Sequence, residues 1–374
     1  MKIQHGPWVR GGAAVSFVSL AALMGLSGCS NGDDEETPGA TCPLPSASAV
    51  SVEELAFVQL GAFGSASCGL ANDGKVSCWG AQPDSFSSAT EIEGVEQAAS
   101  LVVDELGGCV LRRGGSVVCW MGDEVAGVPG ICGATAITQN RCAVVGGAVH
   151  CWDVRYPERL GATEAEAARG PVAVPGVAGA VSVASGPNDY TCAALEDGTV
   201  MCWSGGPRPA DRPGVEPAAV PEISGAIDVV GAPEGSSVGG VLTEMCAILE
   251  DRSVTCWSRA RAPSAIDGLS DVVSLSLSQS HACAVSSDGS LRCWGENQMG
   301  QLGDGTTEAK SEPTLVEALT NVVQVTTGSL DSSIGHSCAL LTDGTAWCWG
   351  ANFMGQLGDG SVTDSAQPVA VEFP

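Results

Sequence analysis

In this chain of 374 residues, the cysteines are the residues whose type and regular spacing could support thiol chemistry. Seven times, a cysteine is followed nine or ten residues later by the dipeptide Cys-Trp. The pairs are Cys68/Cys78, Cys109/Cys119, Cys142/Cys151, Cys192/Cys202, Cys246/Cys256, Cys283/Cys293 and Cys338/Cys348. Thiols at this spacing could form disulfides, ligate zinc or stay reduced as small core residues. Because no CxxC motif or Cys/His cluster has zinc-site spacing, we expect disulfides and no bound metal.

Short hairpins would place the two cysteines of each pair opposite one another. In segments such as CAVSSDGSLRCW, apolar positions alternate on both sides of an Asp-Gly turn, which predicts a β-hairpin. Pairing Cys283 with Cys293 leaves the loop Ser287–Gly289, with glycine where a positive φ is required. Pairing Cys142 with Cys151, which are nine residues apart, leaves the two-residue loop Gly146-Gly147. A type I′ turn needs a positive φ at both of its central residues, which two glycines provide. Arg252 stands where other turns have glycine, so we expect strain or a different turn there.

The N-terminal segment has the features of an export signal. Lys2 and Arg10 precede an uncharged apolar run, and Leu26-Ser27-Gly28-Cys29 resembles the lipobox of bacterial lipoproteins, whose cysteine is lipidated. We therefore expect a lipoprotein signal peptide at 1–28, a lipidated Cys29 with an acidic flexible tether at 29–50, and a folded domain at 51–374. An ordinary cleavage site within 13–28 is the alternative. Ser30 after the cysteine favours the outer membrane, so we predict an exported protein, lipid-anchored in the cell envelope.

Export to an oxidising compartment favours disulfides over reduced thiols. Without Cys29, sixteen of the seventeen cysteines remain, and Cys42 and Cys132 fall outside the hairpins. These two could pair with each other, or Cys132 could pair with Cys142, which lies at hairpin spacing. Charge limits the partners: 16 basic and 43 acidic residues give −27, which phosphate backbones would repel, so we expect no nucleic acid.

Two segments carry a family resemblance. WGENQMGQLGDGTT (294–307) and WGANFMGQLGDGSV (349–362), with His281 and His336 each two residues before a cysteine, resemble the regulator of chromosome condensation repeat. That family folds as a seven-bladed β-propeller of four-stranded blades, so the resemblance implies an all-β, seven-bladed propeller over 55–374. Repeats two to five lack the GQLGDG segment. The last residues, QPVAVEFP, predict a C-terminal strand that closes the ring by pairing into the first blade.

The other candidate residues favour structural roles. His281 and His336 occupy equivalent repeat positions, which indicates packing or hydrogen bonding. Asp304 and Asp359 could suggest calcium, but Gly-Asp-Gly is also good turn chemistry. One tryptophan follows each second cysteine, which favours blade packing over a stacking platform for sugars. These tryptophans are Trp79, Trp120, Trp152, Trp203, Trp257, Trp294 and Trp349.

No catalytic motif is present, so we expect no enzyme, no catalytic residue and no cofactor. The family's nuclear archetype acts on a small GTPase and on chromatin, but an exported acidic chain is not expected to share that role. We expect a monomeric scaffold that binds an unidentified envelope or extracellular protein through the irregular loops Arg155–Ala168, Gly205–Pro217 and Ala232–Gly240. Glycan or peptidoglycan binding through exposed aromatic residues is the alternative. A hydrolase, which would need a cluster of histidine, acid and nucleophile from different blades, comes third.

Overall fold

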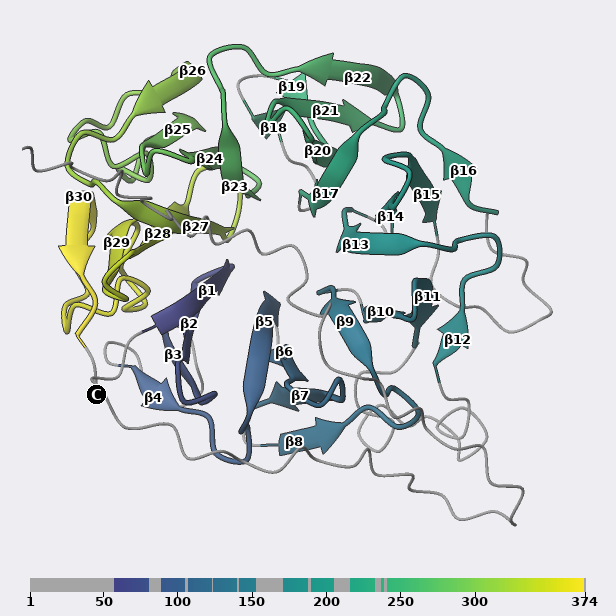
Figure 1. Ribbon diagram of the computed structural model, residues 1–374. Helices are drawn as coiled ribbons and strands as arrows, with labels where there is room; N and C mark the ends of the chain where they lie inside the picture. The colour runs from purple at the N-terminus through teal and green to yellow at the C-terminus, as the bar shows by residue number, and fades with distance from the viewer. Residues whose placement is uncertain are drawn as a thin grey trace, which may run out of the picture.

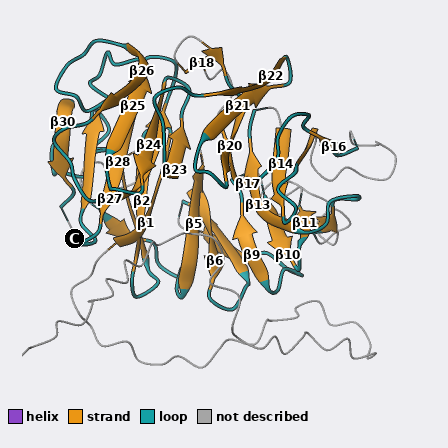
Figure 2. Cartoon of the chain, turned by 45° about the horizontal axis from the view of Figure 1, so that its top comes forward, coloured by secondary structure: helices purple, strands orange, loops and turns teal. Residues whose placement is uncertain are grey.

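The structure is a computed structural model that describes residues 57–80, 89–104, 107–122, 124–139, 141–152, 171–187, 190–204, 216–232, 237–238 and 241–372. Within these residues the chain forms strands, turns and loops, and no α-helix (Figure 2). None of the described segments is therefore a helix that could cross a bilayer. The predicted signal peptide and tether, with Cys29 and Cys42, lie outside these residues.

Seven four-stranded antiparallel sheets follow one another around a ring, which confirms the predicted propeller (Figure 1). Each blade uses one continuous stretch of chain, and its strands run outward in chain order from the centre. Blades 1 and 2 contain β1 (Phe57–Phe63), β2 (Ala66–Ala71), β3 (Val76–Gly80), β4 (Thr90–Glu91), β5 (Ala98–Asp104), β6 (Gly107–Arg112), β7 (Val117–Met121) and β8 (Glu124–Gly127). Blades 3 and 4 contain β9 (Ala134–Ile137), β10 (Cys142–Val145), β11 (Ala148–Cys151), β12 (Val172–Ala173), β13 (Ala180–Ser185), β14 (Tyr190–Leu195), β15 (Val200–Ser204) and β16 (Ala218–Ala219).

The remaining blades follow the same order, with one insertion. Blade 5 contains β17 (Ala226–Gly231), β20 (Met245–Leu249), β21 (Val254–Ser258) and β22 (Arg261–Ala265), and the two-stranded sheet of β18 (Ser237–Val238) and β19 (Val241–Leu242) lies between β17 and β20 in the chain. Blade 6 contains β23 (Val272–Leu277), β24 (His281–Ser286), β25 (Leu291–Gly295) and β26 (Lys310–Leu315). Blade 7 contains β27 (Val322–Ser329), β28 (Gly335–Leu341), β29 (Ala346–Gly350) and β30 (Ser365–Ala370).

The hairpins have the predicted register. Cys283 lies opposite Cys293, and Gly289 takes the left-handed conformation with φ 82°. The two-residue turn Gly146-Gly147 has φ 56° and 79°, as a type I′ turn requires. Arg252 keeps the same turn as the glycine-bearing hairpins at φ 64°, so the expected strain is present.

All seven predicted disulfides are formed, each between the second and third strands of its blade, with Cα–Cα distances of 4.0–4.1 Å. They join Cys68 to Cys78, Cys109 to Cys119, Cys142 to Cys151, Cys192 to Cys202, Cys246 to Cys256, Cys283 to Cys293 and Cys338 to Cys348. Seven disulfides indicate an oxidising, extracytoplasmic environment.

The short Cα–Cα distance follows from the position of the cysteines in the ladder. The backbone bond from Ser286 to Ser290 closes the sixth hairpin, so the alternation of the ladder makes Cys283/Cys293 a non-hydrogen-bonded pair. Such pairs are the closer of the two types in an antiparallel sheet. The hairpin register itself therefore places the two cysteines at a separation that suits a disulfide.

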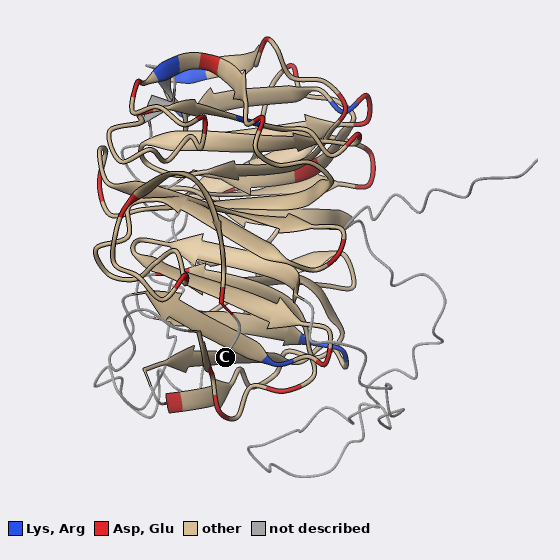
Figure 3. Ribbon diagram, turned by 90° about the vertical axis from the view of Figure 1, so that its left-hand side faces the viewer, with Lys and Arg blue, Asp and Glu red and all other residues tan. Residues whose placement is uncertain are grey.

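The hydrophobic core consists of clusters that lie between neighbouring blades. The cluster between blades 6 and 7 joins Leu291 and Leu302 of one blade to Val325 and Trp349 of the next. All seven repeat tryptophans are at most 6% exposed, so they pack between blades as predicted. Acidic residues, in contrast, lie mostly in the loops and turns at the edges of the ring (Figure 3).

The ring closes between blades 7 and 1, but not by the predicted strand pairing. β30 pairs with β29 and completes blade 7, because β1 to β4 already supply four strands to blade 1. The C-terminal segment still contributes to closure, since Val371 packs in one cluster with Phe57 and Trp79 of blade 1. Closure therefore depends on contacts between two complete sheets and not on a shared strand.

Candidate binding site

The fourteen disulfide cysteines are structural residues of the blades. Their positions on the third strands, Cys78, Cys119, Cys151, Cys202, Cys256, Cys293 and Cys348, are at most 7% exposed. Their partners on the second strands, Cys68, Cys109, Cys142, Cys192, Cys246, Cys283 and Cys338, are at most 3% exposed. As oxidised and buried groups they provide neither thiolate nucleophiles nor metal ligands. The other residues that can form a functional site lie at the interfaces between blades.

The GQLGDG segments cover the tryptophan of the following blade. We call Gly300–Gly305 of blade 6 and Gly355–Gly360 of blade 7 the covering loops. The Trp349 Nε1–H donates to the Gln301 carbonyl at 2.9 Å, and the Trp79 Nε1–H donates to the Gln356 carbonyl at 3.0 Å. The leucine of each loop is at most 1% exposed. Each covering loop thus supplies an acceptor and an apolar side chain to the next blade.

Buried amides hold the covering loops in shape. Asn297 is fully buried, accepts from the Leu302 N–H at 2.9 Å and donates to the carbonyls of Thr306 and Glu308. Asp304 accepts from the N–H and the hydroxyl of Thr306. Both donors use Asp304 Oδ1, which caps a turn, and no group of three possible metal ligands occurs among the described residues. The Gly-Asp-Gly chemistry is therefore that of a turn.

The two repeat histidines connect neighbouring blades. The Ser337 hydroxyl donates to the Gln301 carbonyl at 2.8 Å, so it accepts from His281 Nε2–H at 2.8 Å. The same chain of bonds runs from His336 through Ser67 to the Gln356 carbonyl. Burial, followed by the neighbouring His336, lowers the pKa of His281 to about 3, and burial lowers the pKa of His336 to about 4. Both rings are neutral at pH 7, in the structural role that the repeat position predicts.

These contacts pair serine with histidine but do not form a hydrolase site. His281, His336 and Ser337 are all fully buried, so a substrate cannot reach them. No carboxylate of the described residues hydrogen-bonds to either histidine, so the acid of a triad is missing there.

The interface between blades 4 and 5 replaces each part of this arrangement. Two residues before the cysteine, where blades 6 and 7 have histidine, blade 4 has Tyr190 and blade 5 has Glu244. Met245 stands where Ser337 stands in blade 7, and repeat four lacks the GQLGDG segment. The Trp257 indole Nε1 is consequently buried without a hydrogen-bond partner.

A pocket of about 670 Å³ lies at this interface, within the size range of ligand sites in proteins. Its wall combines Trp203 and Val220 of blade 4 with Trp257 and Ser258 of blade 5. Of the fourteen disulfide cysteines, Cys202 contributes to this wall. We call it the blade 4–5 pocket. The rim carries exposed charged residues of both signs, which are Glu216, Glu222, Arg259 and Arg261.

An ion pair orders one side of the blade 4–5 pocket. Arg259 donates to Glu244 through Nε at 3.1 Å and Nη2 at 2.9 Å, and its guanidinium lies 5.3 Å from the centre of the Tyr190 ring. Burial alone would raise the pKa of Glu244, but the bonds from Arg259 lower it below its usual range. Burial raises the pKa of Tyr190, although the nearby Trp257 indole opposes that shift. The Tyr190 hydroxyl lies near that indole without meeting hydrogen-bond geometry.

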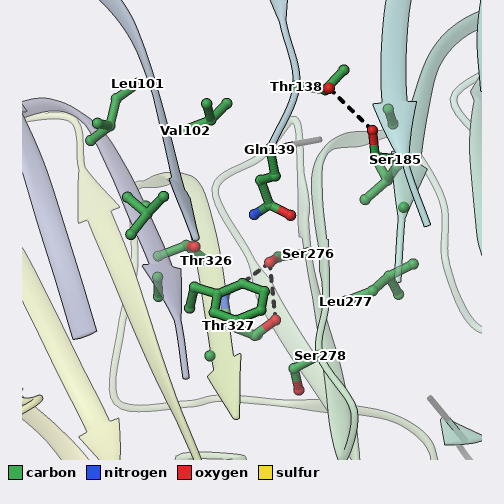
Figure 4. A pocket seen from close by; sticks show the side chains of 18 of the residues that line it. Leu101, Val102, Thr138, Gln139, Ser185, Ser276, Leu277, Ser278, Thr326 and Thr327 are labelled. Carbon is green, nitrogen blue, oxygen red and sulfur yellow. Dashed lines mark hydrogen bonds between the residues drawn. The ribbon is translucent and has the colours of Figure 1, made fainter. Parts of the chain in front are cut away.

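A second cavity, of about 220 Å³, lies at the centre of the ring and is lined by the innermost strands of all seven blades (Figure 4). Uncharged hydroxyl and amide groups surround it, with Gln139 pointing inward. Several hydroxyls already bond across blades, as Ser276 does to Thr327 at 3.0 Å and Ser185 does to Thr138 at 3.1 Å. The cavity is smaller than ordinary ligand sites, which makes the blade 4–5 pocket the stronger candidate.

The loops predicted as the contact face are described only in part. Arg155–Ala168 lies outside the described residues, as does most of Gly205–Pro217, but Glu216 of that loop lines the blade 4–5 pocket. Ala232 of the third loop is 1% exposed and belongs to the core, which corrects its assignment as a free loop residue.

Cys132 is disulfide-bonded, and its partner is not Cys142, because Cys142 bonds to Cys151. Cys42 lies outside the described residues, so its pairing with Cys132 stays a prediction.

The pocket residues Tyr190 and Arg259, and Glu244 that pairs with Arg259, were not singled out from the sequence. The available signal was the loss of the GQLGDG segment in repeat four together with the loss of the histidine in repeats four and five. By analogy with blades 6 and 7, the first loss removes the carbonyl that accepts from the tryptophan, and the second removes the histidine that bonds to the serine on that carbonyl. The shielding of the repeat tryptophans also weighs against glycan binding through them as an exposed platform.

Comparison with known proteins identifies the repeat. Residues 288–340 and 343–374 match the regulator of chromosome condensation (RCC1) repeat, and residues 272–301 match a second description of the same repeat. The chain is similar to the Protein RCC2 homolog of Danio rerio, with 29% identity over 44% of this chain and 36% of that protein. It is also similar to the Ultraviolet-B receptor UVR8 of Arabidopsis thaliana, with 39% identity over 21% of this chain and 17% of that receptor. The chain thus spans about a third or less of these relatives.

Among solved structures, the chain resembles PorZ, a bacterial surface component of the type-IX secretion system of Porphyromonas gingivalis. The TM-score is 0.53 at 12% identity, over 86% of this chain and 39% of PorZ. At that identity the likeness concerns the fold alone.

Proposed function

We propose that this chain, an RCC1-repeat protein, is a scaffold that binds another protein through the sector of blades 3 to 5. The observation that supports this is the blade 4–5 pocket, which lies where the covering loops protect the interfaces 6–7 and 7–1. A rigid ring whose interfaces differ in this way can present one sector to a partner while the others maintain the fold.

We further propose that Cys29 carries a lipid that holds the scaffold in the cell envelope, at the outer membrane. The support is the lipobox-like Leu26–Cys29 together with the seven disulfides, which need an oxidising compartment. Labelling the producing cells with an alkyne-tagged fatty acid should mark the protein, and Cys29→Ala should abolish the label and release the protein from membranes. Unchanged labelling of the variant would contradict the anchor.

The binding proposal can be tested with an oxidatively folded, signal-free Cys29→Ala form as bait for the host's envelope proteins. We expect one protein to crosslink stoichiometrically around β16 and β22. Ala219→Trp places a large side chain in the blade 4–5 pocket and should lower the yield at least tenfold.

Leu315→Trp is the matched control, because Leu315 occupies on blade 6 the register position of Ala219 on blade 4. It should leave the yield unchanged. Crosslinks confined to other blades, or equal yields from the two variants, would overturn the choice of sector. Absence of any protein partner, with saccharide binding instead, would favour the glycan alternative.

A further inference from the structure

We propose that the blade 4–5 pocket binds a leucine followed by glycine in a loop of the partner protein, with the main-chain carbonyl before that leucine accepting a hydrogen bond from the Trp257 indole N–H. This inference rests on the proposed function and names the chemistry of the partner. The partner loop would resemble the covering loops that this chain places on its own tryptophans.

The chain itself contains the template for this interaction. At the interface between blades 6 and 7, Leu302 is buried beside Trp349, and the preceding carbonyl accepts from the indole. A Cβ built on Gly303 would lie 2.7 Å from the Trp349 Nε1, so only glycine fits there. The interface between blades 7 and 1 has the same arrangement, since Leu357 is buried beside Trp79 and Gly358 lies against the Trp79 ring. At both of these interfaces the tryptophan is covered by the same sequence of groups, which is a carbonyl, a leucine and then a glycine.

Interface 4–5 retains the receiving half of this interaction. Trp257 is 2% exposed and aligned in sequence with Trp349, and Val220 corresponds to the Val316 that packs beside Leu302. Both Trp257 and Val220 line the blade 4–5 pocket.

Two buried polar atoms of the pocket wall have no partner. They are the Trp257 Nε1 and the Ser258 hydroxyl, on residues that are 2% and 5% exposed. A buried donor without an acceptor costs about 1–3 kcal/mol, so a ligand that supplies a carbonyl gains by removing that cost. Sugar hydroxyls could also accept, but the apolar wall of Val220, Pro221 and the two tryptophans favours an aliphatic side chain.

A second copy of this chain is not the proposed occupant. Its own GQLGDG segments are already buried against Trp349 and Trp79, so offering one would disrupt the donor molecule. The connection 205–215 of this chain is the remaining competitor, and the experiment below includes it as an outcome.

The probe is a capped synthetic peptide with the sequence of residues 299–306, MGQLGDGT, added to the oxidised, signal-free protein. Indole N–H signals are followed by ¹⁵N NMR, and the Trp257 signal is identified by its loss in Trp257→Phe. We expect the Trp257 signal to shift saturably toward the position of the hydrogen-bonded Trp349 and Trp79 signals. Trp257→Phe should weaken peptide binding about fivefold, the worth of one hydrogen bond. A peptide with aspartate in place of leucine should not bind.

Trp120→Phe is the matched control, because Trp120 carries the same kind of buried, unpartnered N–H at the interface of blades 1 and 2. It should leave peptide affinity unchanged, and near-ultraviolet circular dichroism would verify that both variants are folded. Equal affinity for the two variants, or no saturable shift, would overturn the inference.

A Trp257 signal that already lies beside those of Trp349 and Trp79, and that ignores the peptide, would assign the pocket to the chain's own 205–215 segment and also overturn it. Failure of this inference is distinguishable from failure of the proposed function. If a protein crosslinks at β16 and β22 and the peptide does not compete with it, the scaffold proposal is supported and only the proposed recognition of leucine and glycine is wrong.

Discussion

At the scale of single residues, the hairpin turns show how local strain enters this fold. Arg252 holds a left-handed φ of 64° at the position where Gly289 and its equivalents have glycine. That conformation costs a residue with a Cβ roughly 1–2 kcal/mol.

Arg252→Gly should therefore stabilise the protein by roughly 0.5–1 kcal/mol, because relief of the strain exceeds the extra chain entropy of glycine. Urea denaturation under oxidising conditions would measure the free energy of unfolding. Arg252→Ala removes the side chain and keeps the Cβ, so it should not reproduce the gain. Equal stabilisation by both variants would show that the arginine side chain, and not its φ, is the source.

The buried histidines predict how stability depends on pH. The folded pKa values of about 3 for His281 and about 4 for His336 lie below the ordinary 6.5, so the unfolded chain binds more protons between these limits. Their contribution to stability is complete above pH 6.5 and is lost as the pH falls to about 4 for His336 and to about 3 for His281, by up to about 1.4 kcal/mol per pH unit for each histidine. Asp228 acts in the opposite direction, since burial raises its pKa.

The histidine contribution can be isolated by comparing chemical denaturation of the protein and of His336→Gln at pH 7, 6, 5 and 4.5. The variant should be less stable at pH 7, because it loses the bond to Ser67, and its stability should fall less steeply on acidification. Parallel curves would mean that His336 does not titrate as its burial requires.

At the scale of elements, the covering loop and the tryptophan beneath it act as a unit. Trp349 and Trp120 are both fully buried, but only the Trp349 N–H has an acceptor. Substitution by phenylalanine removes the same volume at both sites.

Trp349→Phe should therefore destabilise the protein by at least about 1 kcal/mol more than Trp120→Phe, because it breaks a hydrogen bond where the other removes an unsatisfied donor. Thermal and urea unfolding of the two variants would measure the difference. Equal losses would show that the Trp120 N–H has an acceptor in solution.

The hairpins could be predicted from the sequence, because two independent features fix each register. The cysteine spacing and the turn glycine agree on Ser287–Gly289 in one hairpin and on Gly146-Gly147 in another. The blade 4–5 pocket could not be predicted in the same way. Tyr190 and Arg259 are far apart in the chain, and only the packing of neighbouring blades brings the guanidinium over the ring.

At the scale of the whole molecule, the position of β30 shows what a repeat pattern leaves undetermined. A C-terminal strand can complete its own blade or the first blade, and the repeat pattern of the sequence is consistent with both pairings. The structure gives four strands to each blade, so the first and last blades meet without sharing a strand. Phe57 N–H donates to the Gly344 carbonyl at 3.1 Å, and Gln324 bonds to both backbone polar groups of Leu60.

The last residues nevertheless matter for cooperativity. Deleting 366–374 would remove nearly all of β30 and the Val371 side chain, which is 7% exposed and lies in the cluster with Phe57 and Trp79. Outside the β29–β30 ladder, three backbone bonds would also be lost, from Val371 N–H to the Ala346 carbonyl, from Glu372 N–H to the Gly358 carbonyl and from Gly305 N–H to the Ala366 carbonyl. The second bond anchors the covering loop over Trp79, so the deletion weakens blade 7 and its interface with blade 1 together.

We therefore expect the truncated protein to lose its single cooperative unfolding transition, since blades in a ring are stabilised by both neighbours. Calorimetry would show a broad transition, and the Trp79 indole signal would move toward that of an unpartnered N–H. Removal of 373–374 alone is the control and should leave the transition sharp. A truncated protein that melts as sharply as the full chain would mean that the six remaining interfaces hold the ring without the seventh, and that closure through Val371 is dispensable.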